Sequence, residues 1–281
     1  MNYEMICVNE NNGIFTIALN RPEKRNAFND QLIAELVDAL KTADSDSVRV
    51  IVLTGHGKHF SAGADLEWMR RMINLSYEEN LEDAHQLANM LRLLNEHPKP
   101  VIAGVKGSAF GGAIGLIACS DIALATPETQ FALSEIKLGL IPATISPFVI
   151  DAIGPRQCRK LFLTGEVFNA EKAQDYGLVH EIVDPCAFDE HLQHLASHIA
   201  ALPPQAVSEV KRLIREVSQP EPRGAIYEYT CQRIAHLRVA PEGQEGLSAF
   251  LEKRAPQWPD VQSASDQTEI SRAHTAKGNK E

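Results

Sequence analysis

The stretch that decides the fold is residues 101–119, VIAGVKGSAFGGAIGLIAC. Its first five residues, Val101 to Val105, are apolar and follow two prolines, which predicts a buried strand. Gly111-Gly112-Ala113 then opens an apolar helix that reaches about Cys119. Free N–H groups at a helix N-terminus, aided by the helix dipole, suit this junction to hold an oxygen that gains negative charge. Glycine-rich turns also serve close packing alone, so the motif needs support from the rest of the chain.

Two further segments carry candidate chemistry. Upstream, the apolar run 48–54 (VRVIVLT) predicts a strand that leads into the loop Ser61-Ala62-Gly63-Ala64-Asp65-Leu66. Its small side chains let a ligand approach the backbone N–H groups, and Asp65 can cap the following helix. Downstream, Glu135 is the one carboxylate in the apolar stretch 133–142 (LSEIKLGLIP). Burial would raise its pKa and suit it to proton transfer, with capping or ion pairing as the alternative.

Strands, glycine-containing loops and helices alternate along most of the chain, which predicts an α/β fold with ligands at the loops that follow strands. After about residue 195 the strand pattern stops. We expect an α/β core over residues 1–195, a helical C-terminal module over 196–259 and a disordered tail over 260–281. The expected strands are 13–19, 48–54, 101–105, 121–125 and 130–133. The expected helices begin with one capped by Asn29 or Asp30 and continue with 79–96, 143–153, 155–163, 170–176, 205–217, 223–239 and 242–253.

Composition excludes several classes of protein. Lysine and arginine total 27 against 37 acidic residues, a net charge of −10, which argues against nucleic acid or an anionic membrane as partner. No targeting signal and no apolar stretch of the ~20 residues that span a bilayer is present. The five cysteines are scattered, without metal-ligand spacing, which indicates reduced thiols in a cytoplasmic protein and no metal site.

Several segments together resemble the crotonase (enoyl-CoA hydratase/isomerase) superfamily over nearly the whole chain. They are NRPEKRNAF (20–28), HFSAGADL (59–66), GVKGSAFGGAIGL (104–116), CSDIALATPETQFALSEIKLGLIP (119–142), LTGEVFNAEKAQDYGLVHEIV (163–183) and EGQEGLSAFLEKRAPQW (242–258). The resemblance implies a crotonase-like spiral of ββα repeats with a helical C-terminal oligomerisation module. It also implies a homotrimer or homohexamer that acts on an acyl-CoA, with coenzyme A as part of the substrate and no separate cofactor.

The resemblance assigns roles residue by residue. The backbone N–H groups of Ala64 and Gly112 would form an oxyanion hole for the thioester oxygen, and losing one such donor typically lowers the rate by ~10²–10³. Glu135 matches the second of the two catalytic glutamates of the hydratases. The expected substrate- and CoA-binding positions are Arg25, Ala27, Ala62, Asp65, Leu66, Gly111, Phe250 and Lys253.

The first hydratase glutamate is absent, because Gly115 stands where that residue matches. One interpretation is a hydratase that uses Glu135 alone, with water held by the backbone or by a carboxylate of the substrate. The segments FSAGADLEWMRRM (60–72) and FALSEIKLGLIPATISPFVI (131–150) resemble bacterial methylglutaconyl-CoA hydratases of leucine degradation and the related carboxygeranoyl-CoA hydratases. This resemblance favours the hydratase interpretation. The alternatives are a Δ3,Δ2-enoyl-CoA isomerase with a single glutamate and a crotonase-fold protein that binds CoA without catalysis.

Overall fold

The computed structural model describes residues 3–219 and 222–258, so the tail expected over 260–281 lies outside the described residues. The chain divides into two compact units after Ala201. Among the described residues, the first unit contains every strand and the helices up to α7 (Phe188–Ala200), and the second contains three helices.

The main sheet of the first unit has six strands in the order β1-β2-β3-β4-β6-β9. β1 and β2 form an antiparallel hairpin, and each later pair of neighbours is parallel. Parallel neighbours require crossover connections, and the helices supply them. The strands are β1 (Ile6–Asn11), β2 (Ile14–Leu19), β3 (Val50–Gly55), β4 (Val101–Val105), β6 (Ile122–Ala125) and β9 (Glu181–Ile182).

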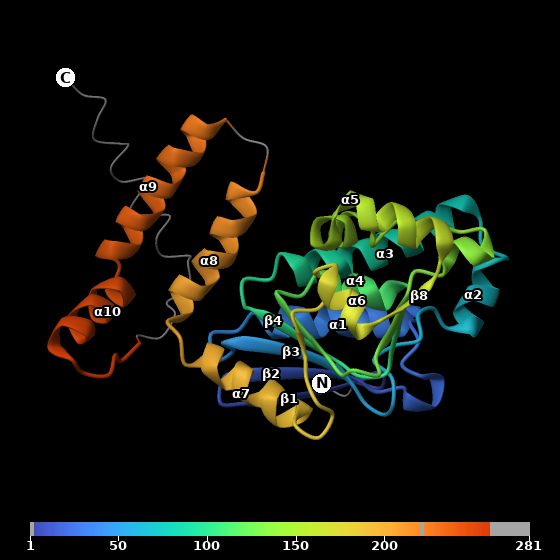
Figure 1. The fold of residues 1–281 in the computed structure, drawn as a ribbon, viewed down its shortest axis with the longest axis horizontal. Helices are drawn as coiled ribbons and strands as arrows, with labels where there is room; N and C mark the ends of the chain where they lie inside the picture. The colour runs from blue at the N-terminus through green and yellow to red at the C-terminus, as the bar shows by residue number, and fades with distance from the viewer. Residues whose placement is uncertain (1–2, 220–221, 259–281) are drawn as a thin grey trace. The chain divides into compact units, whose positions relative to one another are not determined.

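Helices cover both faces of this sheet, as β3 shows. Its side chains alternate, because successive residues of a strand point to opposite faces. Ile51 and Leu53 join the larger apolar core with helices α1 (Asp30–Thr42) and α3 (Tyr77–Asn95), whereas Val50 and Val52 pack against α7 (Phe188–Ala200) on the other face. Figure 1 shows α7 on the side of the sheet opposite α1, α3 and α4 (Gly112–Ala118).

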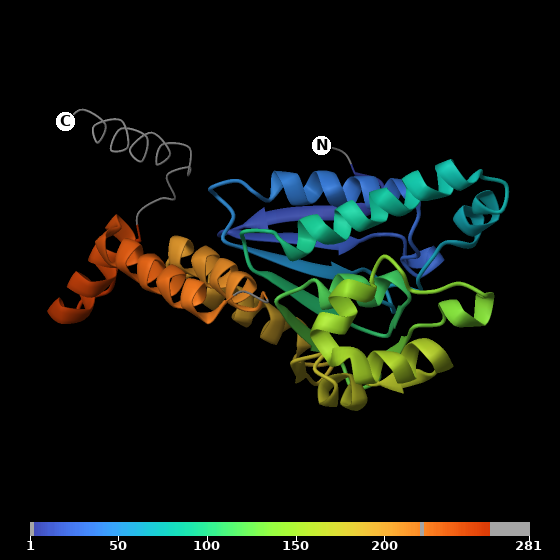
Figure 2. The ribbon, with the colours of Figure 1, turned by 90° about the horizontal axis from the view of Figure 1, so that it is seen from above.

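Helices α1 (Asp30–Thr42) and α3 (Tyr77–Asn95) lie side by side over the sheet (Figure 2). α1 begins where the Asn29 side chain accepts the N–H of Leu32 at 2.8 Å, as the sequence predicts. α3 begins with a reciprocal pair of hydrogen bonds between Ser76 and Glu79, which satisfies two N–H groups at that end.

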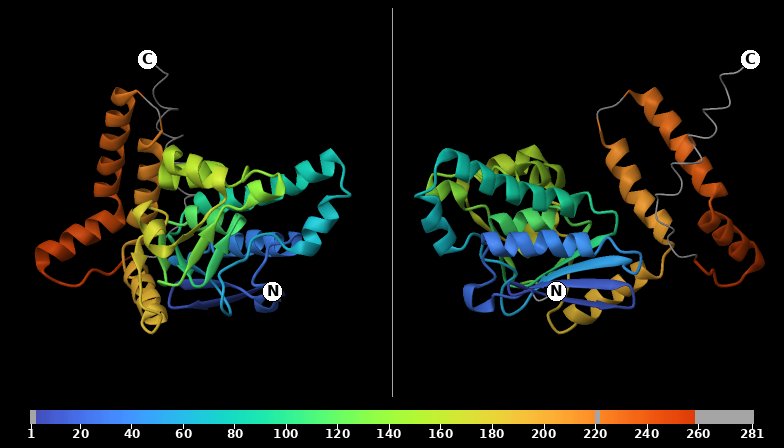
Figure 3. Two further views of the ribbon diagram at one scale, coloured as in Figure 1. Left: turned by 45° about the vertical axis from the view of Figure 1, so that its right-hand side comes forward. Right: turned by 180° about the vertical axis from the view of Figure 1, so that it is seen from behind.

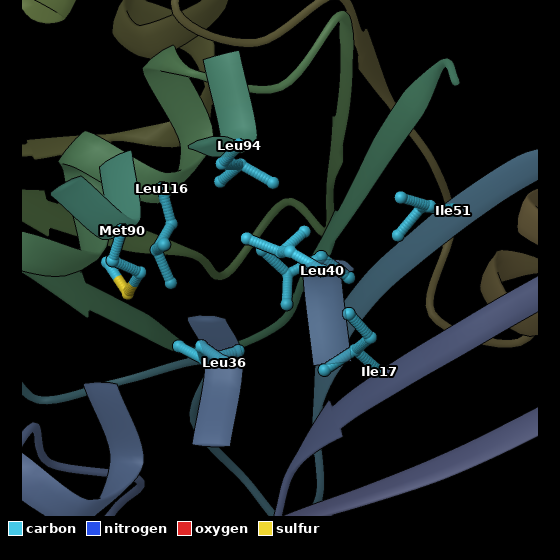
Figure 4. Close-up of a pocket in the computed structure, with 8 residues that line it drawn as sticks. Ile17, Leu36, Leu40, Ile51, Met90, Leu94 and Leu116 are labelled. Carbon is cyan, nitrogen blue, oxygen red and sulfur yellow. The ribbon is translucent and has the colours of Figure 1, made fainter. Parts of the chain in front are cut away.

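A small void of about 10 Å³ lies inside the core between these helices and the sheet (Figure 4). Its lining is entirely apolar, so a water molecule there would have no hydrogen-bond partner. We interpret it as a gap in packing and not as a ligand site. The residues around it are Ile17, Leu36, Leu40, Ile51, Leu53, Met90, Leu94 and Leu116.

A second sheet, with the order β5-β7-β8, carries the functional loops. Its strands are β5 (Ser108–Phe110), β7 (Gln130–Ala132) and β8 (Val167–Asn169), and α4 (Gly112–Ala118) begins two residues after β5 ends. α5 (Ser146–Thr164) packs on α4 and is interrupted at Gly154, whose φ of 78° breaks the helix into the two halves that the sequence predicts. The short helices α2 (Leu66–Met72) and α6 (Ala170–Asp175) complete the unit.

The second unit consists of α8 (Pro204–Val217), α9 (Arg223–Val239) and α10 (Pro241–Glu252), and Figure 3 shows α8 and α9 running alongside each other. Among its described residues only Ala240, Glu242 and Ala249 are buried. The Glu242 carboxylate accepts the N–H groups of Gln205 (3.0 Å) and Ala206 (2.7 Å) and so caps α8. The unit therefore has almost no apolar core of its own.

The elements expected from periodicity are present within a few residues of their predicted bounds. The short strands β5, β8 and β9 were not expected, because two or three residues cannot show an alternation clearly. The edge strand β1 was not expected either. Helix α7 was also not expected, and it crosses residue 195, where we expected the core to end. Leu192, Ala196 and Ile199 pack on the sheet, which keeps this helix in the first unit.

Candidate active site

The loop that carries Ala64 is paired with the segment before α1. The N–H of Phe28 donates to the oxygen of Gly63 at 2.7 Å, and the N–H of Asp65 donates to the oxygen of Phe28 at 2.8 Å. In this parallel bridge Phe28 faces Ala64, so the N–H of Ala64 points away from Phe28. It donates to no acceptor among the residues that the structure describes.

The opposite edge of the same loop is paired with β5. Ser61 donates its N–H to Ser108 at 3.0 Å and accepts that of Phe110 at 3.1 Å, and Gly111 donates to Ala132 of β7 at 2.9 Å. These bonds place the two glycine-containing loops next to each other. The two loops, distant in the sequence, thus become neighbours through backbone pairing alone.

Gly112 is the first residue of α4, and its N–H is directed to no acceptor in the described part of the chain. The first N–H groups of a helix have no partner within it. The loops approach closely here, since a Cβ added to Gly63 would lie 3.1 Å from the oxygen of Phe110. Only glycine allows that approach together with the φ of 89° at Gly63. The site therefore offers two free N–H groups on adjacent loops.

Glu135 lies beside these loops, at the start of the short helix η2 (Glu135–Leu138) that follows β7. A Cβ added to Gly111 would be 3.2 Å from Glu135 Oε1 and 3.9 Å from the Cα of Gly63. The carboxyl group and both loops thus meet at Gly111. A side chain there would occupy the space between them.

The environment of Glu135 favours its neutral form. Burial raises the pKa of its carboxyl group above the ordinary value, and a backbone hydrogen bond lowers it by less. Oε2 is buried and has no hydrogen-bond partner among the described residues. A buried polar atom without a partner is unfavourable for stability and is typical of a functional group.

Asp65 is placed differently. Its carboxylate is 4% exposed, accepts the N–H of Glu67 at 2.7 Å, and forms an ion pair of 2.8 Å with Arg21. Burial alone would raise the pKa of Asp65, but the Arg21 hydrogen bond and the N–H groups of Glu67 and Trp68 outweigh it and hold the pKa below its usual value. The side chain is therefore engaged in capping α2, and a ligand could contact only the backbone of this residue. The ion pair with Arg21 was not expected from the sequence.

The other expected CoA-binding residues fall into separate groups. Arg25 is exposed and Ala62 donates its N–H to the Arg25 oxygen at 2.9 Å, which brings these two positions together beside the first loop. Ala27 is buried, whereas Leu66 is 70% exposed. Phe250, 82% exposed, and Lys253 belong to the second unit.

Gly115 lies one turn after Gly112 on α4, and the space that a side chain would need is taken. A Cβ there would be 2.4 Å from Cγ2 of Ile145 and 3.2 Å from Cδ2 of Leu91. Ile145 is 2% exposed and directly precedes α5. Sequence reasoning identified Gly115 but not Ile145, because nothing in the apolar run around Ile145 indicates its contact with α4.

No group of three or more histidine, cysteine, aspartate or glutamate side chains within residues 3–219 and 222–258 is placed to hold a metal ion. The helices of those same residues include none that is long and apolar enough to cross a membrane.

Comparison with known proteins fits this geometry. A family model described as enoyl-CoA hydratase/isomerase matches residues 9–262, and the chain belongs to that family. An enoyl-CoA hydratase structure from Shewanella pealeana superposes with a TM-score of 0.88 at 42% identity, covering 91% of this chain and 96% of that one. The architecture is therefore the crotonase fold.

Two curated relatives from Escherichia coli (strain K12) have different activities. The 2,3-dehydroadipyl-CoA hydratase is 33% identical, with 89% of this chain and 97% of the relative covered. The 1,2-epoxyphenylacetyl-CoA isomerase is also 33% identical, with 91% and 98% covered. The family thus establishes an enoyl-CoA hydratase/isomerase type of enzyme, and overall similarity does not distinguish hydration from isomerisation.

Proposed function

We propose that this protein is an enoyl-CoA hydratase that adds water across the 2,3 double bond of a branched enoyl-CoA, with 3-methylglutaconyl-CoA or a related acyl-CoA as substrate. The observation that carries the proposal is the half-buried Glu135 carboxyl group beside two loops, each with a free N–H. The thioester oxygen accepts hydrogen bonds from Ala64 and Gly112. Coenzyme A is part of the substrate, and the reaction requires no further cofactor.

The mechanism follows from these groups. The two N–H groups draw electron density onto the thioester oxygen, which leaves the β-carbon electron-poor. The oxygen of a water molecule bonds to the β-carbon, and the α-carbon takes a proton from the neutral Glu135 carboxyl group. The attacking water then loses a proton, which restores the Glu135 acid, so the net change is the addition of one water. The raised pKa of Glu135 supports its role as proton donor near neutral pH.

A substrate with its own carboxylate suits a site with one catalytic acid. Gly115 offers no group that could orient the attacking water, and Ile145 fills the adjacent space with hydrocarbon. A carboxylate on the acyl chain could hold that water. The resemblance of residues 60–72 and 131–150 to methylglutaconyl-CoA hydratases supports the same substrate class.

The second candidate is Δ3,Δ2-enoyl-CoA isomerisation. The observation that favours it is the single carboxyl group, because one acid–base group can take a proton from one carbon and return it to another two bonds away. No water enters the product in this reaction. The molecular mass of the product therefore separates the two functions.

The test is turnover of 3-methylglutaconyl-CoA, crotonyl-CoA and 3-hexenoyl-CoA by the purified protein, with products identified by mass spectrometry. We expect 3-methylglutaconyl-CoA to gain one water and the other two to react little. If 3-hexenoyl-CoA gives a product of unchanged mass whose double bond has moved, the protein is an isomerase and not a hydratase. Binding of all three without reaction would indicate a non-catalytic CoA-binding protein.

We also propose that the protein works in the cytoplasm as a homotrimer or homohexamer. The support is the uncovered apolar face of α8, on which Val210 and Ile214 are 53% and 62% exposed although the helix is strongly amphipathic. Ile214→Asp is expected to leave the helix content unchanged and to reduce the mass measured by light scattering. The control change Arg212→Gln, at an exposed residue two positions away and so on the other side of the same helix, should leave the mass unchanged. Equal effects of the two changes would contradict an interface on this face.

A further inference from the structure

The contact between Gly115 and Ile145 joins two elements at the active site. Gly115 is three residues after Gly112, so both lie on the same side of α4. In a helix each Cα–Cβ bond tilts toward the N-terminus, and a side chain at residue 115 would therefore point toward the Gly112 end of the helix. That end is where one of the two N–H groups of the proposed oxyanion hole lies.

The space in that direction is occupied by Ile145. A Cβ on residue 115 would be 2.4 Å from Ile145 Cγ2, closer than real Cβ atoms approach other atoms, and 3.0 Å from Ile145 Cβ. Ile145 cannot easily give way, because it is 2% exposed and its oxygen accepts the N–H of Val149 in the first turn of α5. The chain thus holds a glycine and a bulky β-branched residue in direct contact.

Ile145 and Glu135 belong to one segment of chain, which leaves β7, forms η2 and enters α5. Glu135 brings a carboxyl group to the Gly111 end of the loop that opens α4, and Ile145 brings hydrocarbon to Gly115 within that helix. The same segment therefore carries the Glu135 carboxyl group and, through Ile145, occupies the space that an acidic side chain at residue 115 would need.

We infer that Ile145 is a specificity-determining residue of this enzyme. Together with Gly115 it fills with hydrocarbon the place from which a second carboxylate would act, so the site favours acyl chains that carry their own carboxylate over simple unbranched chains. This inference rests on the proposed hydratase function. It adds that the contact between Gly115 and Ile145, and not Gly115 alone, sets the preference for acyl chains that carry a carboxylate.

The first experiment tests the packing independently of catalysis. Gly115→Ala, Ile145→Ala and the double variant are compared with the wild type by thermal unfolding of the full-length protein. We expect Gly115→Ala to lower Tm by several degrees through overpacking and Ile145→Ala to lower it by creating a cavity. The double variant should lose clearly less than the sum, because the added methyl group enters the space that the isoleucine vacates.

A matched control uses Ile153→Ala, a buried isoleucine two turns further along α5. Combined with Gly115→Ala it should give an additive loss of Tm. A wild-type Tm for Gly115→Ala, or additive losses in the pair with Ile145→Ala, would overturn the inference.

The second experiment tests specificity with crotonyl-CoA, which has no distal carboxylate. Gly115→Glu alone is expected to unfold or to hydrate crotonyl-CoA no faster than the wild type. Gly115→Glu with Ile145→Gly is expected to hydrate it at least tenfold faster than either single variant, since a placed acid–base group contributes ~10²–10⁴ in rate. The ratio of kcat/KM for 3-methylglutaconyl-CoA over crotonyl-CoA should fall accordingly.

The outcomes separate the two proposals. A wild type that hydrates no enoyl-CoA would contradict the proposed function, while the Tm comparison and any gain on crotonyl-CoA would still decide the role of Ile145. A folded double variant that binds CoA like the wild type and gains nothing on crotonyl-CoA would overturn the specificity role. A variant with Gly115→Glu and Ile145→Gly that does not fold would also overturn the specificity role. The space vacated by Ile145 would then not accommodate the glutamate side chain.

Discussion

Asp65 and Glu135 are two carboxyl groups at neighbouring loops of one site, and their surroundings are opposite. The oxygens of Asp65 are bonded to Arg21 and to backbone N–H groups, and the pKa of this residue is lowered. Glu135 has one buried oxygen without a partner among the described residues, and its pKa is raised. The first group stabilises the loop as an anion, whereas the surroundings of the second favour its neutral, protonated form.

The difference shows how one site can hold its shape and still carry a reactive group. The hydrogen bonds of the Asp65 side chain and the pairing of the loop with Phe28 hold the loop, so the free N–H of Ala64 stays in place. The Glu135 carboxyl group lies on a different segment, where burial outweighs the one backbone hydrogen bond that favours its charged form. Changes to Asp65 should therefore act mainly on stability, and changes to Glu135 mainly on turnover.

The largest expected effect is the loss of turnover in Glu135→Gln. The amide keeps the shape of the side chain but cannot deliver and regain a proton, so kcat should fall by ~10³ or more, near the upper range for an acid–base group. Steady-state kinetics on the substrate identified above, together with CoA binding by calorimetry, would measure this. Glu96→Gln, the same change at an exposed ion pair with Arg92, serves as control and should leave both unchanged. Near-normal activity of Glu135→Gln would exclude Glu135 as the proton donor.

The next effect is on stability, in Asp65→Asn. The amide oxygen can still cap α2, but Arg21, whose side chain is only 11% exposed, loses its counter-charge. Removing one partner of a buried ion pair typically costs about 3–5 kcal/mol, and the partial exposure of Arg21 places the expected loss near about 3 kcal/mol. Urea unfolding would measure it. Asp30→Asn, which breaks an exposed ion pair with Arg71, should change the midpoint little, and equal losses in the two variants would contradict the distinction.

The smallest effect is a pH dependence of opposite sign at the two residues. The folded protein holds the Glu135 proton to higher pH than the unfolded chain does, so this residue contributes stability below its unfolded pKa and loses it as pH rises through the raised folded pKa. Asp65, with a lowered pKa, contributes stability above its unfolded pKa and loses it as pH falls through the folded value. Each unit of pKa shift corresponds to about 1.4 kcal/mol.

Thermal unfolding across pH 3 to 8 would test these signs. Relative to the wild type, Glu135→Gln should become more stable as pH rises from acid to neutral. Asp65→Asn should become less stable over the lower part of the same range. A Glu135→Gln curve parallel to that of the wild type would mean that the pKa of Glu135 is not raised.

The sequence predicts most of the fold because its signals are local. The cap at Asn29 and the apolar spacing after it define α1, and the two glycines before Ala113 define the start of α4. The same local reading marks Ala64, Gly112 and Glu135 as candidates, although their roles come from resemblance to a family. What the sequence does not contain is the pairing of segments far apart in the chain.

Ile145 and Arg21 illustrate that limit. Ile145 lies in an apolar run that fits any buried helix start, and only the three-dimensional structure brings it against Gly115, 30 positions earlier in the chain. Arg21 stands in the sequence beside the charged residues Glu23, Lys24 and Arg25, and only the structure shows its guanidinium group paired with Asp65. The helices α8 to α10 were predicted correctly from periodicity, yet periodicity does not say which surface covers them.

The overlap between residue 115 and Ile145 also has an evolutionary consequence. A lineage with this pair cannot acquire a second carboxylate in one favourable step, because a side chain at residue 115 arrives in occupied space. Shortening Ile145 first leaves a cavity and no new chemistry. Each single change is expected to lower stability, so the effect of a change at one position depends on the residue at the other. The contact thereby opposes the gain of a second carboxylate at residue 115 through single substitutions.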